Sequence, residues 1–102
     1  MAAIVKWTDG ALADIEAIAE YIARDSEKQA KLQVQLFFEQ AAVLEQYPLK
    51  GHFVREVHNA EIREILVNNY RIIYRVLAPD LIHVLTVYHS KRLLSGEDIE
   101  TR

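Results

Sequence analysis

The side chains that could do chemistry gather between Ile62 and Leu94. They are four arginines and one histidine: Arg63, Arg71, Arg75, Arg92 and His89. Cleavage of RNA by its own 2′-hydroxyl needs a base, an acid and cations that stabilise the phosphorane charge. His89 could be the acid or the base, Glu56 or Glu64 could be the base, and the arginines could bind phosphate. Arginines on a sheet also commonly pair with glutamates or with a partner's carboxylates. The set therefore fits a metal-free ribonuclease or a protein-binding surface.

The histidines do not have the spacing of a metal site. If His83 and His89 lie on one strand, they are roughly 20 Å apart, too far to share an ion. His52 and His58 also miss the usual spacing, and the chain has no cysteine. Its three glycines cannot build a phosphate loop or a dinucleotide fingerprint. We therefore expect neither a metal nor a cofactor.

Length and composition are those of one small globular domain over residues 1–102. About half of the residues, 51%, are apolar and 26% are charged, which is ordinary for a soluble protein. The absence of cysteine fits a reducing compartment. No apolar run reaches the roughly 18 residues of a membrane helix, and the N-terminus has no signal-peptide layout. These features predict a cytoplasmic protein that does not enter a membrane.

The charge is unevenly distributed along the chain. The net charge is −3, which argues against a general nucleic-acid coat. Residues 1–50 hold 5 basic and 8 acidic side chains, whereas residues 51–94 hold 6 basic and 4 acidic ones. The second half is thus locally positive within an acidic chain.

Two amphipathic helices are predicted in the first half, after a short β-prone run at residues 3–7. Apolar residues spaced three and four apart predict a helix over 11–25, with Thr8 or Asp9 as its cap. Ser26 fits the cap of a second helix that runs to Gln46 or Tyr47. The short link between the helices makes them an antiparallel hairpin. The second helix has apolar residues on two sides, so it is either sandwiched or meets a partner.

Three strands are predicted in the second half, at 62–67, 70–77 and 81–89. Asn68-Asn69 suits a two-residue hairpin turn and Ala78-Pro79-Asp80 a second turn, so the strands are antiparallel. An extended segment is also expected at 55–57, after the loop that begins at Leu49. Residues 95–102 are expected to be a mobile tail, with one turn of helix at 95–99.

Side-chain alternation divides the middle strand into two faces. Tyr70, Ile72, Tyr74 and Val76 share the more apolar face, which the helices should cover. The opposite face, with Arg71 and Arg75, mixes arginines with apolar residues. We interpret it as a surface that accepts another chain, although many antiparallel sheets simply leave one face half-solvated.

Taken together, these motifs resemble the RelE/ParE superfamily of bacterial toxins. The resemblance spans residues 4–94 and lies in Ala11-x-x-Asp14-Ile15-x-x-Ile18-x-x-Tyr21-Ile22, Pro48-x-x-Gly51, Ile62-Arg63-Glu64, Tyr70-Arg71-Ile72-Ile73-Tyr74-Arg75-Val76 and His89-x-x-Arg92. It implies an α+β fold in the order β-α-α-β-β-β, with a helical hairpin packed on an antiparallel sheet. It also implies a type II toxin–antitoxin system, in which a cognate antitoxin wraps the toxin as a hetero-oligomer.

The superfamily contains two activities, and the ParE-like one is favoured. ParE-like toxins inhibit DNA gyrase, and their expected roles are growth inhibition and plasmid stabilisation. The acidic net charge and the absence of lysine and tyrosine after Arg92 argue against ribosome binding. On this interpretation no residue is catalytic, and target or antitoxin recognition falls to Arg63, Arg71, Arg75, His89, Lys91, Arg92, Leu32 and Leu36. The alternative is a RelE-like ribosome-dependent mRNA interferase, in which His89, Arg63, Arg71 and Arg92 would be the active site.

Overall fold

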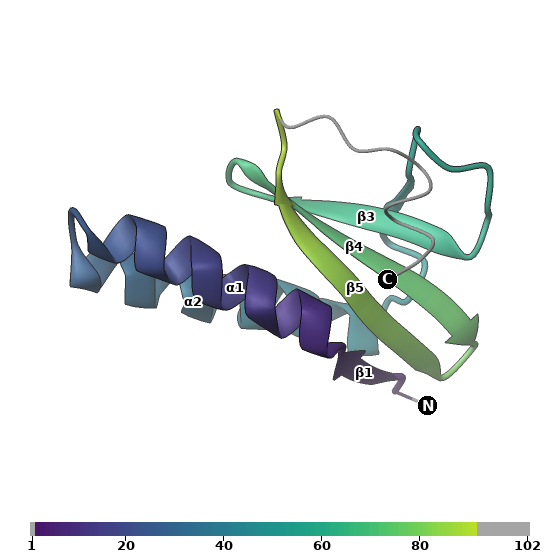
Figure 1. Cartoon of the computed structure of the whole chain (residues 1–102). Helices are drawn as coiled ribbons and strands as arrows, with labels where there is room; N and C mark the ends of the chain where they lie inside the picture. Colours follow the sequence, from purple (N-terminus) through teal and green to yellow (C-terminus); the bar gives the residue numbers. More distant parts are fainter. Residues whose placement is uncertain (1, 92–102) are drawn as a thin grey trace.

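The computed structural model describes residues 2–91, which form two helices packed on a five-stranded sheet (Figure 1). Its elements are β1 (Ile4–Trp7), α1 (Asp9–Ala23), α2 (Glu27–Ala42), the 3₁₀ turn η1 (Val43–Glu45), β2 (His52–Phe53), β3 (Ile62–Val67), β4 (Tyr70–Ala78) and β5 (Leu81–His89). The sheet order is β1-β5-β4-β3-β2. The predicted α+β fold is confirmed. The tail at 95–102, its helical turn at 95–99 and Arg92 lie outside the described residues.

Both predicted helix caps are present. The Thr8 hydroxyl accepts a hydrogen bond from the Ala11 N–H, and the Ser26 hydroxyl accepts one from the Gln29 N–H, each at 3.1 Å. Such bonds satisfy backbone donors that have no partner in the first turn of a helix. α1 and α2 lie against each other, and their connected ends project beyond the sheet (Figure 1).

The second helix ends earlier than predicted. The α-helix stops at Ala42 and the chain continues as the tighter turn η1, where the N–H groups of Gln46 and Tyr47 both bond to the Val43 carbonyl. The turn buries Leu44 completely. The apolar spacing continued past Ala42, but spacing does not separate an α-helical turn from a 3₁₀ turn.

The three long strands pair as predicted. β3, β4 and β5 are antiparallel neighbours, and Asn68 turns the β3–β4 hairpin with a φ of 55°. Asparagine adopts this left-handed conformation more easily than most residues. β1 confirms the strand predicted within residues 3–7, but the sequence did not predict its position in the sheet: it pairs in parallel with β5, with Ile4 opposite Leu81.

Side chains from α1 and from its cap, Thr8, complete the edge of β5 beyond the end of β1. The Thr8 hydroxyl donates to the Val84 carbonyl at 2.9 Å, where a register shift leaves Leu85 as an extra residue. Further along, the Asp14 carboxylate accepts hydrogen bonds from the Thr86 hydroxyl and the Val87 N–H. The helix thereby takes the place of the missing neighbouring strand.

The main core lies between the helices and the sheet. It contains Ile15 and Phe37 from the helices and Ile72 and Tyr74 from β4, so the helices cover the predicted face. The Tyr74 hydroxyl donates to the Pro48 carbonyl and accepts from the Gly51 N–H, each at 2.9 Å. These two bonds fix the loop after η1 against the core.

The opposite face of the sheet has a small core of its own, contrary to the expectation of a surface open to another chain. Val54 and Val57 pack there on Ile62 and Ile73, and Ile73 is completely buried. The strand predicted at 55–57 was wrong, because Arg55 begins a turn and the extended residues are His52 and Phe53. Folding segment 54–61 back onto the sheet removes its apolar residues from water, which alternation along β4 alone could not predict.

Candidate functional site

Arg71 lies at the centre of an ion-pair network on this second face. Its side chain bonds Glu56 in a bidentate manner at 2.8 and 2.9 Å, and it bonds Glu64 at 2.6 and 2.7 Å. Only 8% of the residue is exposed. The hydrogen bonds that Arg71 donates to Glu56 raise the pKa of Arg71, and the same bonds lower the pKa of the Glu56 carboxyl. One guanidinium between two carboxylates leaves the cluster with a net negative charge.

Arg63 is engaged by the loop that follows η1. It donates to the carbonyls of Gly51 at 2.9 Å and Leu49 at 3.3 Å, and its guanidinium lies 4.4 Å from the centre of the Phe53 ring. Since Arg63 is directly opposite Tyr74, it belongs to the helix-covered face of the sheet. Arg63 therefore braces a loop in this structure.

His89 ends β5 next to Tyr70. It is exposed, its ring centre lies 5.5 Å from that of Tyr70, and its Nδ1 accepts a hydrogen bond from the Lys91 N–H at 3.2 Å. In the neutral ring the proton is then on Nε2. Burial raises the pKa of the Tyr70 hydroxyl, with a smaller contribution from Tyr21. A pocket of about 240 Å³ opens here between α1 and the ends of β4 and β5.

The residues proposed for a nuclease site do not all come together. His89 pairs with Tyr70 and Arg63 with Tyr74, four residues further along β4, which is about 13 Å along the strand. Arg71 points to the opposite face and is held by its glutamates. No group of three or more histidine and carboxylate side chains that could hold a metal is found among residues 2–91.

The other predicted recognition residues are spread over the surface. Arg75 is half-buried and lies 4.0 Å from Glu61, whereas Lys91 is exposed. On α2, Leu36 packs on the main core and Leu32 is exposed. Their roles in recognition stay predictions.

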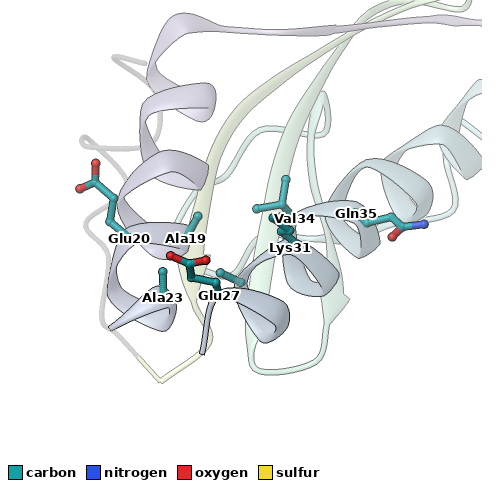
Figure 2. A pocket seen from close by; sticks show the side chains of 8 residues that line it. Ala19, Glu20, Ala23, Glu27, Lys31, Val34 and Gln35 are labelled. Carbon is teal, nitrogen blue, oxygen red and sulfur yellow. The ribbon is translucent and has the colours of Figure 1, made fainter. Parts of the chain in front are cut away.

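A groove that the sequence did not predict runs between the projecting ends of α1 and α2 (Figure 2). It has a volume of about 640 Å³ and is floored by small apolar side chains, with charged groups at its rim. Its lining residues are Ala19, Glu20, Ala23, Glu27, Ala30, Lys31, Val34 and Gln35. Alanines at helical spacing predict close helix packing, but only the structure shows that the helices leave a groove there.

Known proteins resemble the chain in sequence and in structure. Residues 5–94 match the family described as the ParE toxin of type II toxin–antitoxin system, parDE. Toxin RelE2 from Caulobacter vibrioides is 33% identical over 89 residues, which cover 87% of this chain and 97% of that protein.

Solved structures share the fold. A chain of the chromosomal ParDE toxin–antitoxin system from P. aeruginosa has a TM-score of 0.71 and 25% identity, covering 87% of this chain and 97% of that one. A chain of the toxin–antitoxin complex RelBE2 from Mycobacterium tuberculosis has a TM-score of 0.65 and 22% identity, covering 87% of this chain and 99% of that one. A mutant E. coli toxin RelE in the free state has a TM-score of 0.64 and 13% identity, covering 99% of this chain and 93% of that one.

No helix among the described residues has the length and hydropathy to cross a membrane. Because the family match spans most of the chain, the protein belongs to the ParE toxin family of type II toxin–antitoxin systems.

Proposed function

We propose that this toxin inhibits DNA gyrase and that a cognate antitoxin protein neutralises it. The observation that carries the choice of target is the pairing of Arg71 with Glu56 and Glu64. A ribonuclease needs uncompensated cations where the phosphate binds, but here the buried Arg71 is already paired with two carboxylates. The net charge of −3 further opposes binding to ribosomal RNA.

A supercoiling assay tests the choice of target. Purified toxin added to gyrase from the same bacterium should slow the supercoiling of relaxed plasmid in proportion to its concentration. Topoisomerase I from that bacterium is the control, because a general effect on DNA would slow both enzymes. If supercoiling is unchanged at a large excess of toxin over gyrase, the proposal is wrong.

We also propose that the antitoxin docks in the groove between α1 and α2. The similar P. aeruginosa chain comes from a toxin–antitoxin system, and a groove of about 640 Å³ with an alanine floor suits the apolar face of a helix. The rim contains both Glu27 and Lys31, so acidic and basic side chains of the antitoxin could each form an ion pair there.

Filling the groove tests the docking site. Ala19→Gln with Ala23→Gln should lower antitoxin affinity on the order of tenfold or more, because longer side chains occupy the floor. Inhibition of gyrase should be unchanged. Ala13→Gln is the matched control, since Ala13 is exposed on α1 and does not line the groove. Equal affinities for all variants, measured by titration calorimetry with the antitoxin encoded beside the toxin, would place the antitoxin elsewhere.

Two observations favour RNA cleavage as a second candidate function. His89 is exposed at the end of β5, and the relative from Caulobacter vibrioides carries the name Toxin RelE2. RNA ends should be mapped after induction of the toxin and of His89→Ala. New 5′ ends linked to codons, and lost in His89→Ala, would establish this function in place of gyrase inhibition.

A further inference from the structure

The loop from Tyr47 to Phe53 is fastened to the core at several points. The buried Tyr74 hydroxyl bonds to Pro48 and Gly51, and Arg63 bonds to the carbonyls of Leu49 and Gly51. Gly51 is required at this position, because a Cβ atom would lie 2.6 Å from both the Tyr74 hydroxyl and the Glu64 carbonyl oxygen. These bonds and the close packing at Gly51 hold the loop against the core.

This fixed loop holds three large apolar side chains out into solvent. Tyr47 is 65% exposed, Leu49 is 62% exposed and Phe53 is 60% exposed. The Arg63 guanidinium lies over the Phe53 ring and restrains it. A hollow of about 590 Å³, lined by Val43, Tyr47, Pro48, Leu49 and Lys50, lies beside them. Because the backbone that carries these side chains is held against the core before binding, a partner that buries them orders less of the chain than it would on a free loop.

The charged side chains within residues 47–55 have one sign, and Glu45 and Glu56 lie just outside this segment. Residues 47–55 include Lys50 and Arg55 but no acidic residue, within a chain whose net charge is −3. Arg63 adds a third positive charge beside Phe53. A partner that covers the three apolar side chains would therefore gain from acidic groups around its own apolar contact.

We propose that the toxin binds its target through Tyr47, Leu49 and Phe53. The target is a folded protein that has an apolar cavity with an acidic rim. Projecting side chains on a fixed loop suit insertion into a cavity of a folded partner, whereas the groove between α1 and α2 suits the reception of a helix. Aromatic side chains that are held rigidly are typical anchors of protein interfaces. On the proposed function, on which this inference rests, that partner is gyrase.

Two variants and a matched control test the contact. Tyr47→Ala, Leu49→Ala and Phe53→Ala together should weaken inhibition of gyrase supercoiling at least tenfold and should abolish growth arrest. Lys50→Glu should weaken inhibition several-fold without removing any apolar contact, because it reverses a rim charge. The control combines Leu12→Ala, Tyr21→Ala and Leu77→Ala, which remove comparable exposed apolar groups elsewhere and should leave inhibition unchanged.

The readouts separate this inference from the proposed function. If wild-type toxin does not inhibit gyrase, the proposed target is wrong, and growth arrest then decides whether the loop contacts the real one. If the triple variant and Lys50→Glu both arrest growth as strongly as the wild type, the loop is not the target contact. Thermal unfolding shows whether each variant is folded, and Lys50→Glu decides the question if the triple variant is not.

Discussion

Arg71 shows how the meaning of a residue depends on its neighbours. In the sequence it is one of several arginines that could bind phosphate. In the structure it is bonded to Glu56 and Glu64, and through Glu56 it ties segment 54–61 to the sheet. Glu64 lies on β3, but Glu56 arrives from a turn that the sequence predicted as extended. Spacing along the chain could not reveal that these three charges meet.

Glu56→Gln should lower the free energy of unfolding by about 1–3 kcal/mol at neutral pH, because Arg71 loses one charged partner. In the wild-type protein, the folded-state pKa of the Glu56 carboxyl is below its ordinary value. The stability that this carboxylate contributes is therefore present above the ordinary pKa and is lost as the pH falls through the folded-state pKa. The difference between wild type and variant should therefore shrink in acid. Urea unfolding at neutral pH and at about pH 3 measures both effects.

The more exposed pair of Arg75 and Glu61 supplies the control for this experiment. Its atoms are 4.0 Å apart and the Glu61 side chain is largely in solvent. Glu61→Gln should change the unfolding free energy by no more than about 0.5 kcal/mol. The stabilising role of the Arg71 network would be refuted if Glu56→Gln changed the unfolding free energy as little as Glu61→Gln. It would also be refuted if the loss of unfolding free energy in Glu56→Gln were the same in acid as at neutral pH.

Among the elements, those set by local signals were predicted well. The caps at Thr8 and Ser26, the turn at Asn68 and the three long strands depend on residues close together in sequence. The parallel pairing of β1 and the fold-back of segment 54–61 depend on contacts between residues farther apart in the sequence. The groove depends on how closely the two helices pack, which their sequence does not give. Of the candidate site, the sequence identified the arginines and His89 but not their partners, nor the projecting Tyr47.

The two helix caps should differ in their contribution to stability. Ser26 only caps α2, so Ser26→Ala should cost about 0.5–1 kcal/mol. Thr8 caps α1 and also donates to the Val84 carbonyl of β5, so Thr8→Ala should cost about 1–2 kcal/mol or more. Denaturant unfolding of both variants measures the difference, and equal costs would show that the bond to β5 contributes nothing.

At the scale of the whole molecule, the contacts proposed for antitoxin and target lie at opposite ends of α2. The groove is beside its first turns, and Tyr47 follows η1 at its other end. Sixteen helical residues separate these ends, which is about 24 Å. An antitoxin confined to the groove would leave the target contact uncovered, so neutralisation requires an antitoxin that reaches along the helix or a large partner that is excluded by its bulk.

The pairing of β1 with β5 also determines when the toxin becomes complete during its synthesis. Thr8 and Val84 are 76 residues apart, yet their bond joins the start of the chain to its last described strand. The sheet cannot close until β5 has left the ribosomal exit tunnel, and closing so long a loop carries an entropic cost that β1 alone cannot offset. A nascent toxin is thus unfinished along the β1 edge of its sheet until β5 has emerged, which gives an antitoxin already present time to meet it.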